Sequence, residues 1–381
     1  MNQNEIIQKI REQKYIDLIN AINPEDNDFL LFKSKSNDTF YLGFGSPKKL
    51  SASELDKCNE PVAIIGDFEA SPEFILFDQY LFYKNGTLET KIKIDLKSFN
   101  GPIDDFRLKD IYYNQDQKQW EKMVLTALEL IHQKQFKKMV LSRDITYSFE
   151  YLNPISFIHQ LLANNDNAKN SFFIVHKEQA TWKISITPEL LFEKENGLIR
   201  SMSLAGSTPR TKDEILNRQN EELLINDEKL ALEHGIVTAE LAQNFESLCE
   251  KYEVSPMNIL KLDYIQHRLQ TIVGKLKPKS QIDHIINLLH PTPAVGTMPK
   301  TNGIKMINQI ENKKRGFYAS PLGIHYQQYA EVAVMLRSAT MTPNQIVLHS
   351  GCGITAGSNA QNEWDETENK TRPYKRLFNQ Q

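Results

Sequence analysis

The chain has 381 residues, 40% hydrophobic and 24% charged, and its 45 basic and 48 acidic side chains give a net charge of −3. This composition is ordinary for a globular protein, and the length allows one large domain or two to three smaller ones. The near balance of charge argues against a protein that binds nucleic-acid phosphates or an anionic membrane. A site for an anionic ligand would therefore have to gather positive charge locally.

Three scattered cysteines, Cys58, Cys249 and Cys352, include no C-x-x-C pair. Their odd number and spacing exclude a disulfide framework and a cysteine-rich zinc site, and they fit a reducing compartment. The first residues lack the basic and then apolar pattern of a signal peptide, and no apolar run approaches the ~18–20 residues that span a bilayer. We therefore expect a cytoplasmic protein.

The first hundred residues predict an opening helix followed by short strands that turn residues separate, as in an antiparallel sheet. The expected strands cover residues 29–32, 39–45, 62–66 and 74–77. Residues 1–115 form the less informative part of the chain, and we expect them to complete the core of the sheet.

The pattern changes near Trp120, where longer helices begin to mix with strands. We expect helices over residues 120–135, 213–250, 255–268 and 302–313, strands over 138–147, 171–175, 181–186, 197–205, 323–340 and 345–350, and a final helix. Strands and helices mixed without βαβ repeats predict an α+β fold. Because no linker divides the chain, we predict a single domain over 1–381 with its catalytic region in 120–372.

Two residues are candidates for acid–base chemistry. Lys138 shares a strand face with Val140, and it either snorkels at a strand end or is desolvated, with a lowered pKa, and acts as a base. Glu189 follows a strand and a proline turn and precedes Leu190 and Leu191. It is either a solvated turn carboxylate or a general acid that apolar neighbours keep protonated. Taken alone, the structural alternative is the more common one in both cases.

Glu233 falls at helical spacing within an apolar stripe that contains Leu230, Val237 and Leu241. A glutamate in such a stripe is almost never unpaired, so we expect it to meet a cation, either a basic side chain or a metal. The neighbouring His234 belongs to another face of the helix, and we interpret it as structural.

The segment from Gly351 to Lys370 combines a glycine turn with an acidic helix. Gly351 and Gly353 allow backbone amides to approach an anion closely. On the helix, Glu363, Glu366 and Lys370 share one face. Either Glu366 and Lys370 form an ordinary i,i+4 ion pair, or the two carboxylates hold a hard cation such as Mg²⁺ while the lysine binds a ligand.

Arg337 interrupts an apolar strand within the run Val332-Ala-Val-Met-Leu-Arg-Ser-Ala, where its guanidinium must be paired. A ligand carboxylate fits the guanidinium fork, and a structural salt bridge is the alternative. The sequence contains no P-loop, dinucleotide-binding glycine motif, H-E-x-x-H or zinc-like histidine spacing, so no nucleotide cofactor is expected.

Ten segments between residues 136 and 370 together resemble the chorismate-utilising enzymes, which include isochorismate, salicylate, anthranilate and aminodeoxychorismate synthases. The resemblance implies large sheets packed as a sandwich with flanking helices. The matching segments, in chain order, are Lys138-Met-Val-Leu-Ser-Arg, Thr187-Pro-Glu-Leu-Leu, Leu204-Ala-Gly-Ser-Thr-Pro-Arg, Glu233-His, Gln266-His, His290-Pro-Thr-Pro-Ala-Val, Arg315-Gly-Phe-Tyr, Leu336-Arg-Ser-Ala, Gly351-Cys-Gly-Ile and Glu363-Trp-Asp-Glu-Thr.

The resemblance also implies roles for the matching residues. Lys138 is implied as the base that activates water for attack at C2 of the ring, and Glu189 as the acid that protonates the departing C4 hydroxyl. Mg²⁺ is implied as the cofactor, held by Glu233, Glu363 and Glu366. The positions implied to bind the substrate are Leu204, Ala205, Gly206, Ser207, His267, Ala294, Tyr318, Arg337, Gly351, Gly353 and Lys370.

Single positions narrow the implied activity within the family. Ala205 stands where aminodeoxychorismate synthases usually carry a nucleophilic lysine, and Ala294 stands where salicylate and anthranilate synthases tend to carry threonine. Leu204 also resembles the isochorismate branch. The resemblance therefore implies an isochorismate synthase, an isomerase. A salicylate synthase is the alternative, and an anthranilate-type synthase or a catalytically silent chorismate-binding relative is less favoured.

The sequence departs from the family pattern near the implied metal residues. Leu230 stands where some members carry a second glutamate before the Glu-His pair, and Ser207 replaces the usual threonine. Neither change touches the implied acid, base or metal carboxylates. We expect a monomer that acts on chorismate without a nucleic-acid, membrane or amidotransferase partner. The sequence does not decide between menaquinone and siderophore biosynthesis as the pathway that the product supplies, and it favours menaquinone only slightly.

Overall fold

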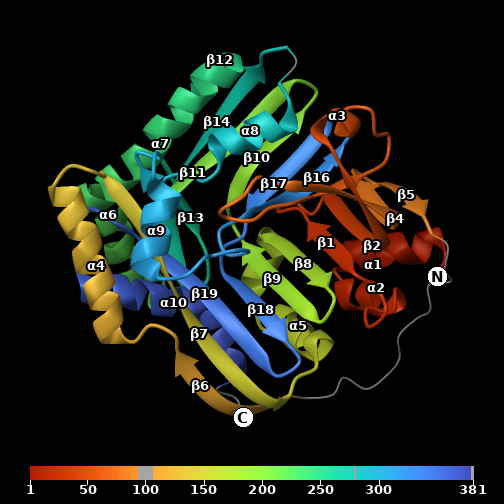
Figure 1. Cartoon of the computed structure of the whole chain (residues 1–381), viewed down its shortest axis with the longest axis horizontal. Coiled ribbons are helices and arrows are strands. Elements are labelled where there is room, and N and C mark those ends of the chain that lie inside the picture. Colours follow the sequence, from red (N-terminus) through yellow and green to blue (C-terminus); the bar gives the residue numbers. More distant parts are fainter. Residues whose placement is uncertain (93–105, 279, 379–381) are drawn as a thin grey trace.

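The computed structural model describes residues 1–92, 106–278 and 280–378. Over these residues the chain forms ten α-helices, one 3₁₀ helix and a single 19-stranded sheet (Figure 1). No helix in the described ranges combines the length and apolarity needed to cross a membrane.

The helices are α1 (Gln3–Arg11), α2 (Tyr15–Ala21), α3 (Ala52–Leu55), α4 (Gln117–His132), α5 (Pro154–Ala163), the 3₁₀ helix η1 (Asp166–Asn170), α6 (Glu214–Asn226), α7 (Glu228–Leu248), α8 (Ile282–Leu289), α9 (Gly303–Glu311) and α10 (Ala360–Phe378). The strands are β1 (Phe29–Lys33), β2 (Thr39–Leu50), β3 (Val62–Ile65), β4 (Glu73–Lys84), β5 (Thr87–Lys91), β6 (Arg107–Tyr113), β7 (Lys138–Tyr151), β8 (Phe172–Glu178), β9 (Thr181–Thr187), β10 (Leu190–Glu195), β11 (Leu198–Pro209), β12 (Cys249–Val254), β13 (Asn258–Lys261), β14 (Ile265–Leu276), β15 (Thr297–Met298), β16 (Pro321–Tyr326), β17 (Tyr329–Val334), β18 (Ser338–Thr342) and β19 (Gln345–Ile354).

The pairings connect the strands into one folded ribbon. Its order is β6-β7-β19-β18-β9-β8-β1-β2-β4-β3-β16-β17-β10-β11-β14, with β15, β5, β12 and β13 attached at β7, β4 and β14. The two halves of the ribbon enclose a core that includes Leu30, Phe32, Ile174, Leu322 and Ala333. The predicted α+β sandwich with flanking helices is confirmed, and every described pairing is antiparallel.

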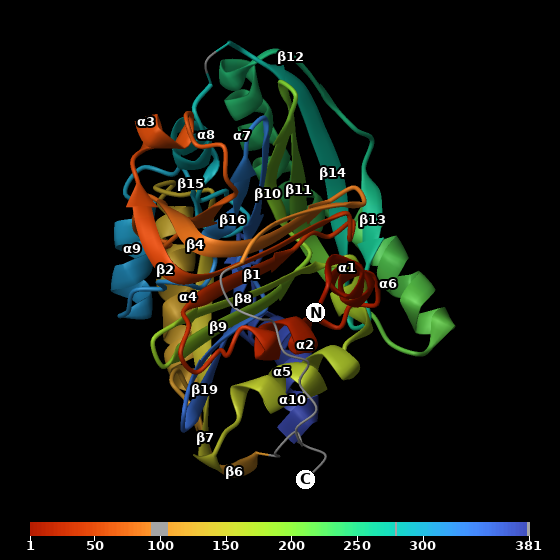
Figure 2. The ribbon, with the colours of Figure 1, turned by 90° about the vertical axis from the view of Figure 1, so that its right-hand side faces the viewer.

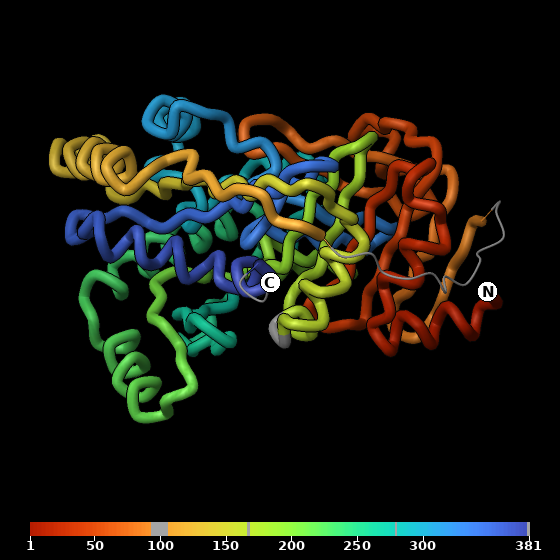
Figure 3. Tube along the Cα trace, turned by 90° about the horizontal axis from the view of Figure 1, so that it is seen from below, coloured from red at the N-terminus to blue at the C-terminus, as the bar shows by residue number. Residues whose placement is uncertain are grey.

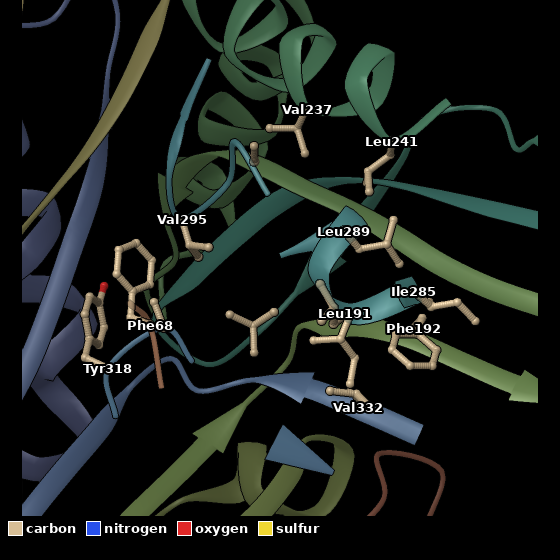
Figure 4. Packing of buried hydrophobic residues seen from close by; sticks show 14 of the residues in the cluster. Phe68, Leu191, Phe192, Val237, Leu241, Ile285, Leu289, Val295, Tyr318 and Val332 are labelled. Carbon is tan, nitrogen blue, oxygen red and sulfur yellow. The ribbon is translucent and has the colours of Figure 1, made fainter. Parts of the chain in front are cut away.

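Helices cover both outer faces of the sandwich. Figure 2 shows α1, α2, α5 and α10 grouped on one side, where they share a core with β8, β9, β18 and β19. A second core lies under α4, α7, α8 and α9. Figure 4 shows Val237 and Leu241 of α7 facing Ile285 and Leu289 of α8 in this core. Seen from below, the N-terminal elements occupy one end of the molecule and α4 and α6 the other, while α10 runs from that other end toward the middle (Figure 3).

The predicted helix over residues 255–268 is wrong, because these residues form β13 and the start of β14. Strand β14 pairs with β11 along its whole length, from Ile265 opposite Pro209 to Lys275 opposite Leu198. Pro256 also disfavours helical backbone at Ser255. Pairing with a strand distant in the sequence therefore overrides the local helical pattern.

Other boundaries differ in detail. The predicted helix over 213–250 is divided at Asp227, whose carboxylate accepts a hydrogen bond from the amide of Leu230 and caps α7. The predicted strand over 323–340 is three strands, β16 to β18. Helices α5 and α8 were not predicted.

A buried ion pair connects α9 to β7. The side chains of Glu311 and Arg315 are both fully inaccessible to solvent. Glu311 accepts hydrogen bonds from the amide (2.7 Å) and hydroxyl (2.9 Å) of Ser142, while Arg315 donates to the carbonyls of Val295 and Val140, both at 2.7 Å. The pair therefore fixes β7 relative to α9 and to the segment before β15.

Removing Glu311 would leave the Arg315 guanidinium buried without its counter-charge. We expect Glu311→Ala to lower the free energy of unfolding by about 3–5 kcal/mol, measured by chemical denaturation. The control is Glu73→Ala, which removes an exposed pair with Lys49 and should cost no more than about 1 kcal/mol. Equal losses in the two variants would contradict this role.

Candidate active site

Most of the predicted site residues surround one cavity, which lies where β7, β19 and α10 meet β11, β14 and the start of β10. The cavity contains about 670 Å³ of space not filled by protein atoms, part of it open to solvent. The predicted residues that line it are Glu189, Leu204, Ala205, Gly206, Ser207, Glu233, His267, Ala294, Tyr318, Arg337, Gly351, Gly353, Glu366 and Lys370. Lys138 and Glu363 are not part of this lining.

Lys138 lies just behind the cavity wall at the buried start of β7. Its Nζ is 3.1 Å from Oε1 of Glu233, and no described group accepts a hydrogen bond from it. Gly353 provides the space for this contact, because a Cβ there would lie 2.2 Å from Oε1 of Glu233 and 2.8 Å from Cε of Lys138. Of the two partners expected for Glu233, the structure shows a basic side chain.

Glu189 is held in the short connection between β9 and β10, and only 3% of its surface is exposed. Its backbone amide donates to Oγ1 of Thr187 (3.2 Å), and its carbonyl accepts from the amide of Val334 (3.0 Å). Burial raises the pKa of Glu189 to about 7, although the positive charges of Lys138 and Lys370 act in the opposite direction. The carboxyl group therefore keeps its proton in a large fraction of molecules at neutral pH, as a general acid requires.

Arg337 lies between β17 and β18, so the prediction that it interrupts a strand is wrong. The chain passes here from one half of the sheet to the other, and Arg337 makes the bend with a φ of +46°. The hydroxyl of Tyr374 donates to the carbonyl of Arg337 at 2.6 Å and holds this strained conformation. The guanidinium donates to Nε2 of His267 at 3.2 Å. Burial, and then the charge of Arg337, hold the pKa of His267 well below its ordinary value, so the ring is a neutral acceptor.

The carboxyl end of β19 brings a second group of polar atoms to the cavity. Nζ of Lys370 donates to the carbonyl of Gly351 at 2.8 Å. A Cβ at Gly351 would lie 2.7 Å from the hydroxyl of Tyr318 and 2.6 Å from the carbonyl of Leu141. Glycine at this position therefore leaves room for the tyrosine hydroxyl in the cavity wall.

Each of the three carboxylates expected to bind a metal contacts one lysine. The pairs are Glu233 with Lys138 (3.1 Å), Glu363 with Lys229 (2.6 Å) and Glu366 with Lys370 (2.7 Å). In the part of the chain that the structure describes, no three His, Cys, Asp or Glu side chains form a preformed metal cage. Mg²⁺ is usually held by one or two carboxylates together with water and substrate, and Glu233 and Glu366 both face the cavity. These two residues therefore fit such an ion.

The two carboxylates of α10 differ in their electrostatics. Burial opposes ionisation of Glu366, but Lys370 and Lys229 outweigh it and lower its pKa. Burial and the charge of Glu366 raise the pKa of Glu363, although Lys229 acts against them. The carboxylate that faces the cavity is thus the more readily ionised of the two.

Sequence reasoning missed several residues of the cavity wall, which are Val140, Pro188, Val295, Leu336, His349, Ser350 and Cys352. His349 is the polar member with the most contacts: Nδ1 donates to Asp144 at 2.9 Å, and Nε2 lies 3.0 Å from Oγ1 of Thr340. Strand alternation places residues 349, 351 and 353 on one face, so this signal was available once the two glycines had been singled out.

The chain is similar to known proteins in sequence. Residues 90–379 match the family described as chorismate binding enzyme. Isochorismate synthase MenF of Bacillus subtilis is 34% identical over 260 residues, which are 68% of this chain and 55% of that protein. Anthranilate synthase component 1 of Saccharolobus solfataricus is 28% identical over 310 residues, 80% and 72% of the two chains. The chain spans about 55–61% of the length of the first two curated relatives.

Solved structures share the fold. MenF of Escherichia coli, described as a menaquinone-specific isochorismate synthase, superposes with a TM-score of 0.81 at 21% identity, covering 92% of this chain and 88% of that one. The Bacillus anthracis protein DhbC, described as a putative 2,3-dihydroxybenzoate-specific isochorismate synthase, gives 0.78 at 21% identity, covering 98% and 99%. With the sequence match over most of its length, the chain belongs to the chorismate-binding enzyme family.

Proposed function

We propose that the chain is an isochorismate synthase, which converts chorismate to isochorismate with Mg²⁺ as its cofactor. The observation that carries the proposal is one cavity that is lined by Glu189, a buried acid with a pKa of about 7, and by Glu233, whose carboxylate contacts the buried Lys138 just behind the wall. A protein that only bound chorismate would have no use for this acid and base.

The two residues divide the proton transfers. Lys138 accepts a proton from the water that adds to C2 of the ring, and Glu189 gives its proton to the C4 hydroxyl, which leaves as water. One water enters and one leaves while the ring double bonds shift, so the reaction needs no oxidant or reductant.

The remaining residues bind the substrate, which carries two carboxylates. Arg337 and Lys370 supply positive side chains. Because Gly351 and Gly353 have no Cβ, the substrate can approach the backbone closely at these two residues. Glu233 and Glu366 would hold Mg²⁺, which supplies charge that neutralises a substrate carboxylate. Two positive side chains of the protein would thus orient the dianionic substrate, and a bound Mg²⁺ would add a further positive charge.

The cavity wall favours this reaction over those of the related synthases. Ala205 lines the cavity without a side chain that could act as a nucleophile, and Ala294 lines it without a hydroxyl. A salicylate synthase, which would go on to eliminate pyruvate, remains the alternative within the enzyme class. Water as the nucleophile requires no ammonia-supplying partner.

We also propose the cellular setting. Three free cysteines fit the cytoplasm. Relatives called MenF, one of them described as menaquinone-specific, support menaquinone biosynthesis as the pathway.

The first test is product analysis. We expect purified protein incubated with chorismate and Mg²⁺ to yield isochorismate without pyruvate, as separated by chromatography. Salicylate together with pyruvate would assign the alternative activity. Unchanged chorismate would overturn the enzymatic function.

The acid and base are tested by two substitutions. We expect Lys138→Ala and Glu189→Gln each to lower kcat by about 10²–10⁴-fold, the usual contribution of a positioned acid or base. Circular dichroism should show a retained fold. Glu195→Gln, at the far end of β10, is the matched control and should keep the rate of the unchanged protein. A near-normal rate in either active-site variant would remove that residue from the mechanism.

The pKa of Glu189 also predicts a pH dependence. A general acid works only while protonated, so kcat/KM should fall about tenfold per pH unit as the pH rises above about 7. The residual rate of Glu189→Gln should lack this alkaline limb. If the limb persists unchanged in that variant, another group is responsible for it.

A further inference from the structure

Lys229 is a charged residue beside the candidate site that the proposed reaction does not use. It lies in the first turn of α7, one helical turn before Glu233. Its Nζ is 2.6 Å from Oε1 of Glu363, whose side chain is only 2% exposed. A buried carboxylate needs a counter-charge, and Lys229 is the side chain that provides it here.

The charges of all three carboxylates expected to bind the cation act on Lys229. Glu233 is its i+4 neighbour on α7, and Glu363 and Glu366 lie one turn apart on α10. The ammonium contacts Glu363 and also interacts electrostatically with Glu233 and Glu366. Lys229 thus contacts one of the three carboxylates directly and is close enough to the other two for their charges to act on it.

We propose that Lys229 is an internal counter-ion that takes the place of the divalent cation in the metal-free protein and competes with Mg²⁺ for these carboxylates. The proposal rests on the proposed function only in taking Glu233 and Glu366 as the cation ligands, while Glu363 is the carboxylate that the ammonium of Lys229 contacts. The side chain of Lys229 is 29% exposed, so its ammonium can leave Glu363 for solvent when a cation arrives. Glu363 would then be free of its lysine partner in the cation-bound protein.

The test is calorimetric titration of MgCl₂ alone, without chorismate, into the full chain. We expect Lys229→Met to bind Mg²⁺ about tenfold more tightly, because one competing charge beside the carboxylates is removed. Lys229→Arg keeps the charge and should stay within about threefold of the unchanged protein. Glu366→Gln should lose most of the affinity, which identifies the titrated site.

Controls separate local competition from other effects. Lys275→Met removes a lysine of an exposed ion pair with Glu250, and its Mg²⁺ affinity should not change. Lys229→Gln is a second neutral variant with the same expected gain, and thermal melting should show that each variant is folded before titration. Unchanged or weaker Mg²⁺ binding in both neutral variants would overturn the proposal, as would an equal gain in Lys229→Arg.

The outcome does not depend on catalysis. A gain in Mg²⁺ affinity in a protein that leaves chorismate unchanged would support the role of Lys229 and reject the proposed reaction. Isochorismate production with no gain in affinity would do the reverse.

Discussion

The buried ion pair between Glu311 and Arg315 is the contact on which the shape of the cavity depends. It binds the carbonyls of Val140 and Val295, two residues of the cavity wall, and Arg315 begins the short segment that leads to Tyr318. Three separate stretches of chain therefore meet at one pair of charges. A buried pair adds little net stability compared with apolar packing, but any other arrangement of these segments would leave a charge unpaired.

Strand β7 also fixes the position of α10. Its alternation turns Val140 toward the cavity and Arg143 toward the helix, where Arg143 donates to Oγ1 of Thr367 at 2.7 Å and stacks 3.7 Å above the ring of Trp364. These contacts lie on the same helix as Glu366 and anchor it against the sheet. One strand therefore positions the walls of the cavity and the helix that carries its acidic residues.

The sequence revealed charged residues in apolar surroundings, and this signal was sufficient to single out Lys138, Glu233 and Arg337. It could not show that residues 255–268 form strands, because the pairing partner β11 lies far away in the chain. Nor could it explain Arg315, which the family resemblance included without a role and which the structure shows donating hydrogen bonds to backbone carbonyls. Lys229 was within reach of helical periodicity, since it precedes Glu233 by four residues, but only the fold brings Glu363 to it.

The candidate site must meet two opposing demands. Glu189 keeps its proton only in a weakly polar environment with little unbalanced positive charge, whereas a dianionic ligand needs several cations. Both lysines near Glu189 are paired with a carboxylate, and burial outweighs their charges, so the pKa of Glu189 is about 7. In the proposed reaction, a divalent cation held by Glu233 and Glu366 would free Lys370 to bind a carboxylate of the substrate. Because such coupling is reciprocal, the anion must favour binding of the cation to the same extent. The net charge of −3 therefore describes the whole chain, whereas at the candidate site each of the three carboxylates is balanced by one lysine.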